Sequence, residues 1–229
     1  MGDGNAQWLS NASSGYPMMQ RTNTTTTDTA LAEHTAEWDA LFRRMISGDD
    51  AAFGKLWSAF NGKLQRYIAK QLGTGPHVED LLQELWMRVI RLRESPKKER
   101  EEKAFHVQAF LFRIAHNLVI DFLRTRKEHA QIDSVDDAYH PTTQARDLSD
   151  PEDLAARALE MLPFDFREVL VLNLHLGYRF DEIAEMLEKS PDAIWARASR
   201  ARAKLRRLVV ELAEREGISL KAYLPNDSD

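Results

Sequence analysis

Residues 180–208 read FDEIAEMLEKSPDAIWARASRARAKLRRL, and this stretch decides the fold of the C-terminal half of the chain. It predicts a short helix from Asp181 to Leu187, a turn of about three residues, and a long helix opened by Ser190 and Pro191. The expected apolar seam of the long helix advances by alternating four- and three-residue steps through Ile194, Ala198, Ala201, Leu205 and Leu208. Two helices joined in this way, the second one basic, predict a helix-turn-helix.

The long helix is basic on the side that the seam leaves outside. Six basic residues and no acidic one lie between Ile194 and Arg207. At the start of the helix, the side chains that we expect to face outward are Asp192, Trp195, Ala196 and Ser199. Along an adjoining stripe they are Arg197, Arg200, Lys204 and Arg207. Short polar groups of such a helix reach base edges, and arginines reach phosphates or guanine. DNA binding is therefore favoured over the alternative of a solvated helical hairpin.

The N-terminal half also has helical periodicity. From Trp38 onward, apolar residues recur at helical spacing in four stretches, at about 38–45, 53–72, 78–89 and 111–122. Asp49 or Asp50 can cap the second helix, and Pro76 fits the first turn of the third. Four helices with short connections predict a compact bundle.

The net charge of −5 hides a strong asymmetry along the chain. Residues 38–126 and 161–210 carry net charges of +5 and +2, whereas residues 1–37, 127–160 and 211–229 carry −3, −6 and −3. Local basic surfaces of this kind suit a polyanionic partner.

The absence of cysteine excludes disulfides, thiol nucleophiles and Cys-ligated metal sites. The histidines lack metal-binding spacings, and there is no Gly-rich phosphate loop or nucleophile elbow. We therefore expect a protein that is not an enzyme and has no cofactor and no metal. There is also no bilayer-length apolar run and no secretory signal, so we expect a cytoplasmic location without a membrane partner.

Composition divides the chain into segments. We expect a disordered N-terminal arm over 1–35, rich in Ser, Thr, Asn and Gly, and a helical domain over 36–126. These segments are followed by a flexible acidic linker over 127–149, a helix-turn-helix domain over 150–212 and a C-terminal tail over 213–229. The expected fold class is all-α, with two helical domains.

Two surfaces of the N-terminal domain stand out. The third predicted helix carries a polar ridge at i, i+3, i+4 and i+7, formed by Asp80, Gln83, Glu84 and Met87. Taken alone, this ridge is an ordinary solvated helix face. The fourth helix combines aromatic with polar and basic side chains: Phe105, Phe110 and Phe112, with Arg113, His116, Asn117, Arg124 and Arg126. Such a mixture suits unstacked bases, although aromatic residues at helical spacing are more often core.

Together these segments resemble the sigma-70 family of bacterial transcription initiation factors, in its extracytoplasmic-function (ECF) form with regions 2 and 4 only. The matching stretches are 79–91, 109–124, 162–170, 182–185 and 197–205. The first two are specific in combination. The helix-turn-helix alone is less specific, because LuxR-type activators share it.

The resemblance implies a role for each surface. The ridge of Asp80, Gln83, Glu84 and Met87 would bind the β′ clamp coiled coil of core RNA polymerase, and region 4 would meet the β flap. The residues implied at the minus-10 element are Phe105, Phe112, Arg113, His116, Asn117 and Arg124. Those implied at the minus-35 element are Ser190, Asp192, Trp195, Ala196, Arg197, Ser199, Arg200 and Lys204. Promoter DNA and an anti-sigma factor are the other implied partners.

Three positions depart from the family pattern. Most members have Gly in the turn where this chain has Glu188, often a basic residue at Trp195, and commonly a larger apolar residue at Ala198. Two other functions remain open from the sequence. One is a helix-turn-helix activator that is independent of core polymerase, and the other is a helical interaction protein that touches no DNA.

Overall fold

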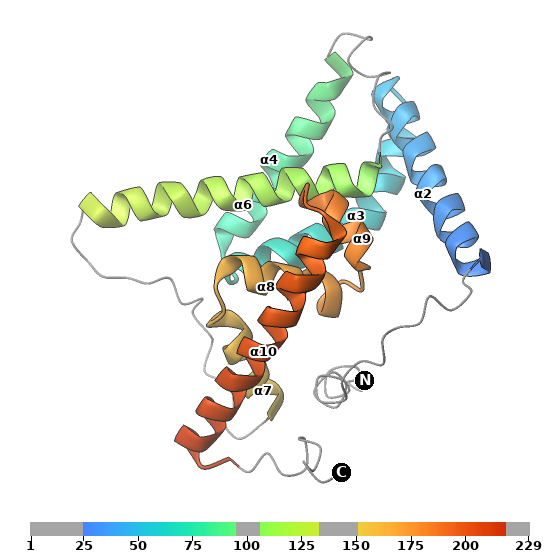
Figure 1. Cartoon of the computed structure of the whole chain (residues 1–229). Coiled ribbons are helices and arrows are strands. Elements are labelled where there is room, and N and C mark those ends of the chain that lie inside the picture. Colours follow the sequence, from blue (N-terminus) through green and yellow to red (C-terminus); the bar gives the residue numbers. More distant parts are fainter. Residues whose placement is uncertain (1–24, 95–105, 133–150, 219–229) are drawn as a thin grey trace.

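The computed structural model describes residues 25–94, 106–132 and 151–218, and every element in these ranges is helical. The N-terminal unit consists of α2 (Thr25–Ile46), α3 (Asp50–Leu72), α4 (Pro76–Arg91), a short 3₁₀ turn η1 (Leu92–Glu94) and α6 (Val107–Ile132). Helix α3 packs against α2, α4 and α6 (Figure 1). Its buried side chains form the middle of the bundle. The all-α prediction is confirmed.

Local signals set several of these helix starts. Asp49 caps α3, because its Oδ1 accepts a hydrogen bond from the amide of Ala52 at 3.0 Å. Pro76 occupies the first turn of α4, as expected. Helix α2 starts at Thr25, so residues 25–35 are helical, and the expectation of a disordered arm over 1–35 is wrong for that part. The run from Ala30 to Glu33 is rich in strong helix formers, which favours this extension.

The C-terminal unit is built around one long helix. It comprises α7 (Pro151–Glu160), α8 (Phe164–Leu170), a π-helical turn η2 (Val171–His175), α9 (Phe180–Met186) and α10 (Pro191–Glu216). Helix α10 packs against α7, α8 and α9. The core that joins α9 to α10 contains the residues expected there: Ile183, Ala184, Leu187 and Ile194 are all buried. The helix-turn-helix is therefore present.

Two further helices are longer than the sequence indicated. Helix α6 continues to Ile132, into the stretch expected to be linker, and the rest of that linker lies outside the described residues. Helix α10 runs four residues past position 212, because Val209, Leu212 and Ala213 continue its buried seam. Val209 replaces Leu208 in that seam, since Leu208 is only partly buried. Gly217, at φ 69°, ends the helix in a left-handed conformation that suits glycine.

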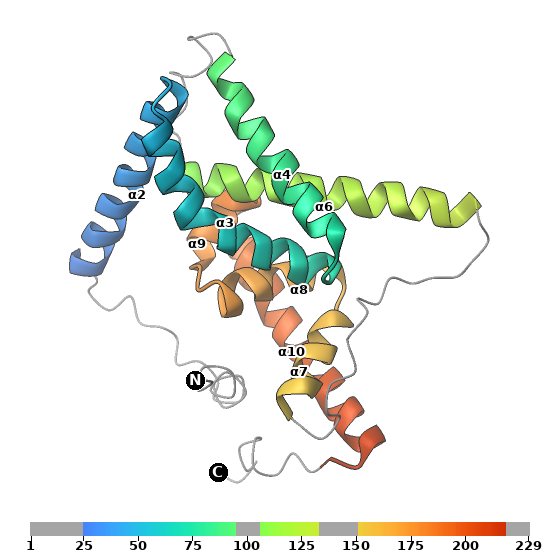
Figure 2. The ribbon, with the colours of Figure 1, turned by 180° about the vertical axis from the view of Figure 1, so that it is seen from behind.

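The two units pack against each other. Helix α9 lies on α6, while α8 and η2 contact α3. Helix α4 packs on α3, α6 and η1, and the view from behind shows it on the opposite side of α6 from α9 and α10 (Figure 2). One side of the N-terminal unit is thus covered by the C-terminal unit, whereas the side that carries α4 is not.

Candidate functional site

The polar ridge on α4 is held in a fixed orientation by the core behind it. Val78, Leu82, Leu85, Trp86 and Val89 form the buried stripe of the helix. The indole Nε1 of Trp86 donates to Oδ1 of Asn61 on α3 at 2.9 Å, which fixes the rotation of α4 about its axis. The ridge residues therefore project from the opposite face.

All four ridge residues are accessible. Asp80, Gln83 and Met87 are exposed, and Glu84 is partly exposed. Glu84 accepts a hydrogen bond from Nε of Arg88 at 2.8 Å, and this bond lowers the pKa of its carboxyl group. An exposed methionine between carboxylates and an amide gives the ridge both apolar and charged contacts to offer to a protein surface.

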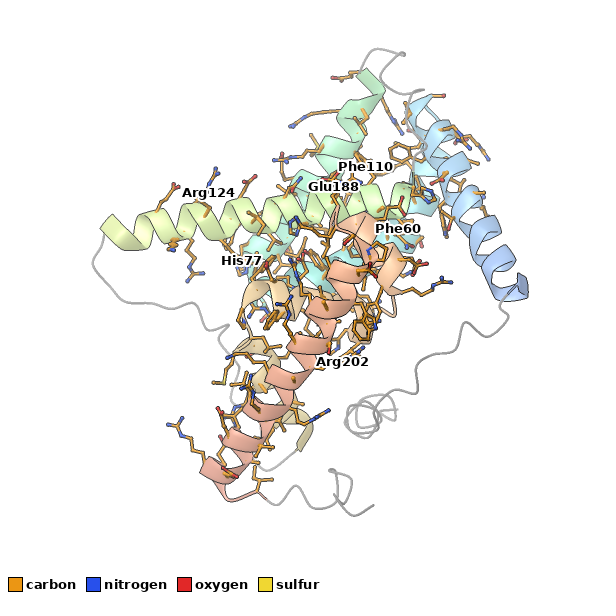
Figure 3. All side chains as sticks on the ribbon, viewed as in Figure 1. Phe60, His77, Phe110, Arg124, Glu188 and Arg202 are labelled. Carbon is orange, nitrogen blue, oxygen red and sulfur yellow. The ribbon has the colours of Figure 1, made fainter. Side chains whose placement is uncertain are left out.

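The residues predicted on α6 divide into two groups. Asn117 and Arg124 are exposed, and Arg124 lies on the part of α6 that extends past the C-terminal unit (Figure 3). Arg113 and His116 are partly buried. Phe112 is only 1% exposed, so it is a core residue in this conformation and not a platform for a base. Phe105 lies outside the described residues.

The recognition helix α10 presents most of its predicted residues. Trp195 is 63% exposed, and Asp192, Ser199, Arg200 and Arg207 are also exposed. Ala196 and Lys204 are partly buried. The Oγ of Ser190 accepts a hydrogen bond from the amide of Ala193 at 3.2 Å, so this hydroxyl serves as the N-cap.

Two arginines of α10 have partners within the C-terminal unit. Nη2 of Arg197 lies 3.6 Å from Oδ2 of Asp165, and the Arg197 side chain is partly buried. Nη2 of Arg202 donates to Oδ1 of Asn173 at 2.8 Å, and its guanidinium lies over the ring of Phe180 (Figure 3). The basic tract between Ile194 and Arg207 therefore has one side that contacts the rest of the C-terminal unit and another, basic side that faces outward.

Glu188 occupies the turn between α9 and α10 in a left-handed conformation, with φ 53°. It is the only non-glycine residue with positive φ among those that the structure describes. Glycine adopts this conformation without the steric cost that a Cβ atom imposes. The turn therefore has the geometry of a glycine position, although the residue is Glu.

A buried carboxylate joins the two units. Glu168 on α8 is fully buried, and its Oε1 accepts hydrogen bonds from the phenol of Tyr67 on α3 and from Nδ1 of His116 on α6, the latter at 2.7 Å. The hydrogen bond to Glu168 raises the pKa of His116 above 6.5. Burial and the same carboxylate raise the pKa of Tyr67 well above 10, so the phenol remains a donor.

Aromatic rings extend this contact. The ring of Phe112 packs edge to face against Tyr67 within its own unit, at 5.6 Å between centroids, and against Tyr178 of the other unit at 5.1 Å. The ammonium of Lys63 lies 5.6 Å from the centroid of Tyr178. Phe112 is therefore enclosed between the two units.

Sequence reasoning missed the interface residues Tyr67, Gln108, Glu168 and Glu182. For the helix-turn-helix side of the interface, the sequence does contain a signal. Glu182, Glu185 and Glu188 recur at three-residue steps and give the first helix of the motif an acidic face. No comparable signal existed for Glu168, whose partners lie 101 and 52 residues away in the chain.

Comparison with known families agrees with this architecture. Residues 56–129, from α3 to α6, match Sigma-70 region 2. Residues 152–205, from α7 into α10, match Sigma-70, region 4. The chain belongs to the sigma-70 family.

Curated relatives identify the sigma-70 branch. The chain is 34% identical over 171 residues to RNA polymerase sigma factor CarQ of Myxococcus xanthus, covering 74% of this chain and 95% of the relative. It is 31% identical over 183 residues to ECF RNA polymerase sigma factor ShbA of Streptomyces griseus, covering 74% of this chain and 93% of the relative. This sigma factor is therefore of the ECF type.

A solved structure shares the fold. It is the sigma factor RpoE in complex with the anti-sigma factor NepR from Bartonella quintana, with a TM-score of 0.53 and 24% sequence identity. The match covers 69% of this sigma factor and 96% of RpoE. In the terms of the family, the bundle of α3, α4 and α6 is region 2, the unit of α7 to α10 is region 4, and Glu168 lies at the contact between them.

Proposed function

We propose that this sigma factor binds core RNA polymerase through the α4 ridge and reads promoters with α6 and α10. The observation that carries the core contact is the arrangement of Asp80, Gln83, Glu84 and Met87 on the one face of α4 that faces away from both the core and region 4. The β′ clamp coiled coil is the partner that the family resemblance implies for this ridge.

Promoter recognition is divided between the two regions. The proposed minus-10 surface lies on α6 and contains Asn117 and Arg124. Arg113 and His116 belong to it as well when region 4 no longer covers them. The proposed minus-35 surface lies on α10 and consists of Asp192, Trp195, Ala196, Arg197, Ser199, Arg200 and Lys204. Ser190 supports it as the helix cap. Basic groups along a helix suit DNA phosphates, and short polar groups near its start suit base edges.

This role requires binding surfaces and no catalytic group in the sigma factor itself. The proposed site of action is the cytoplasm, where core polymerase is found. Within the described residues, no helix has both the length and the apolar character to cross a membrane.

The related RpoE structure contains an anti-sigma factor, and we therefore include such a protein among the proposed partners. We also propose that region 4 meets the β flap of core polymerase. We place the limits of the proposed regions near 36–132 and 151–216.

Charge reversal on the ridge tests the core contact. Asp80→Lys combined with Glu84→Lys should abolish most core binding in a pull-down, because a lost charge-assisted contact in a desolvated interface costs about 2 to 5 kcal/mol. Glu211→Lys combined with Glu214→Lys is the control, since both residues are exposed on α10 and the change in net charge is the same. Equal core binding by the two double variants, each with native helicity by circular dichroism, would refute the role of the ridge.

A further inference from the structure

One exposed apolar side chain lies among the polar and basic residues of α6. Ile120 is 38% exposed, whereas Leu118 and Val119 beside it are buried. Isolated apolar side chains are common on protein surfaces, so exposure alone assigns no role to Ile120. Its neighbours on α6 distinguish it from such isolated side chains.

Ile120 lies in the middle of the proposed minus-10 surface. Residues seven positions apart lie on the same side of a helix, about 10.5 Å apart along its axis. Ile120 comes seven residues after Arg113 and seven before the exposed Lys127, so these three form one row along α6. The exposed Asn117 and Arg124 form the neighbouring row, at i−3 and i+4 from Ile120. Two cations and two hydrogen-bonding groups therefore surround the isoleucine.

The other edge of this surface is acidic. Asp121 and Glu128 are both exposed and form a third row, on the far side of Asn117 and Arg124 from Ile120. Carboxylates repel DNA phosphates, whereas Arg and Lys attract them. A DNA strand on α6 is therefore favoured over the row that contains Ile120 and disfavoured over the row that contains Asp121.

The fold does not explain an isoleucine at this position. Other residues form the buried stripe of α6, among them Leu111, Ala115, Leu118 and Val119. A β-branched residue is less favourable in a helix than alanine or a long unbranched residue. Ile120→Ala should therefore change the midpoint of urea unfolding little, because the higher helix propensity of alanine offsets the lost contacts.

The other two proposed binding surfaces have the same composition. Met87 on the α4 ridge is 42% exposed, and Trp195 near the start of α10 is 63% exposed. Each of the three surfaces thus combines an exposed large apolar side chain with charged or polar neighbours. Such a side chain loses water when a partner binds, and it adds an apolar contact that charged groups cannot make.

The thymine methyl group is the part of a DNA base edge that suits an aliphatic side chain. Thymine presents a C5-methyl group, whereas the edges of the other three bases present only hydrogen-bond donors and acceptors. Asn117, three residues before Ile120, offers an amide for those donors and acceptors. The two side chains can therefore read an apolar and a polar feature of the same stretch of DNA.

We propose that Ile120 is a specificity-determining residue of the minus-10 surface and that it contacts the methyl group of a thymine base. This inference rests on the proposed function, because it assigns one contact within the surface proposed to read the minus-10 element. The contact gives the sigma factor a preference for thymine over uracil at one position of the promoter.

Deoxyuridine tests this contact, because it pairs as thymine does but lacks the C5-methyl group. The templates are copies of a promoter that the holoenzyme uses, with each thymine of the minus-10 element replaced in turn by deoxyuridine. The rate of run-off transcription at limiting wild-type holoenzyme should fall about two- to fourfold at one position, which corresponds to losing one methyl group from an apolar contact.

Variants of Ile120 connect the effect to this side chain. Ile120→Ala should transcribe the thymine and deoxyuridine templates at equal rates, and Ile120→Val should retain most of the wild-type difference. A purely structural defect would lower transcription from both templates and leave their ratio unchanged. Met161→Ala is the control, since Met161 is 45% exposed but lies outside α4, α6 and α10, and it should keep the wild-type ratio.

The outcomes separate this inference from the proposed function. An equal thymine-to-deoxyuridine ratio for wild type and Ile120→Ala, with both proteins forming active holoenzyme, would contradict the role of Ile120 and leave the proposed function intact. The absence of any deoxyuridine effect with wild type would do the same. Failure of wild-type protein to bind core polymerase in a pull-down would contradict the proposed function and, with it, any role of Ile120 in reading a promoter.

Discussion

Nδ1 of His116 and Oε1 of Glu168 lie 2.7 Å apart, although the first residue belongs to region 2 and the second to region 4. The same carboxylate accepts the phenol of Tyr67. One buried group therefore links three helices from both halves of the chain, α3, α6 and α8. The contact places a residue of the proposed minus-10 surface within the interface between the two regions.

This hydrogen bond predicts that the contact between the two regions depends on pH. Because the pKa of His116 is raised above 6.5, protonated His116 stabilises the contact fully below about pH 6.5, and this contribution is lost as the pH rises through the raised value. The charged groups that face His116 are Glu168 and Asp165 on α8 and Lys189 in the turn, with Tyr67 bound to the same carboxylate. Gln108 and Glu182 lie in hydrogen-bond contact across the same interface. The yield of a bismaleimide cross-link within free Gln108→Cys, Glu182→Cys protein, measured from about pH 6 upward, should therefore fall as the pH rises through the raised pKa of His116.

A neutral substitute at position 116 is the control for this titration. His116→Gln in the same double-cysteine background should show a smaller change in yield over that range, after correction for thiol reactivity with a small thiol. A pH profile identical to that of the parent protein would show that another group governs the change.

Removing the buried carboxylate should destabilise the fold. Glu168→Ala leaves the buried phenol of Tyr67 without its acceptor, and we expect a loss of about 1 to 3 kcal/mol in urea unfolding. Adding Tyr67→Phe should recover part of that loss, because the unsatisfied donor is then removed as well. A strictly additive double variant would show that the two groups do not interact.

Asn117 is the most direct test of promoter opening. It is exposed on α6 and carries a hydrogen-bonding amide without a charge, so Asn117→Ala should reduce open-complex formation more than closed-complex formation. Permanganate footprinting of holoenzyme on a promoter measures the open fraction. An equal loss on duplex and on pre-melted template would indicate a folding defect instead.

The recognition helix should separate base reading from phosphate binding. Arg197→Ala should cost about 1 to 3 kcal/mol at one minus-35 position and relax the preference there, whereas Lys204→Ala should weaken binding uniformly and lower the salt slope by about one unit. Selection from randomised minus-35 sequences at two salt concentrations measures both effects. A shifted consensus for Lys204→Ala, with only a uniform loss for Arg197→Ala, would contradict this division of the helix face.

The sequence predicted those parts of the fold that depend on local signals. Asp49 and Pro76 begin helices where expected, and Ile183, Ala184, Leu187 and Ile194 form the predicted core of the helix-turn-helix. The accessible ridge on α4 follows from the same periodicity, because a buried stripe on one face leaves the other face to solvent.

Contacts between the two regions could not be predicted in this way. Phe112 is buried because Tyr178 packs on it from 66 positions farther along the chain, a pairing that no local period encodes. Glu168 is an unremarkable acidic residue in the sequence, and only the approach of α3 and α6 explains its burial. The sequence did show that Glu188 departs from the family pattern, but only the structure shows its positive φ and its ion pair with Arg113.

The most direct test of the central claim is transcription in vitro by core RNA polymerase with this sigma factor on a pool of genomic promoter fragments. The account predicts transcripts that begin at a defined set of promoters, that require the sigma factor, and that disappear with the Asp80→Lys, Glu84→Lys protein but not with the Glu211→Lys, Glu214→Lys control. Transcription that is unaffected by the ridge substitutions, or a sigma factor that binds DNA but never supports initiation by core polymerase, would contradict it.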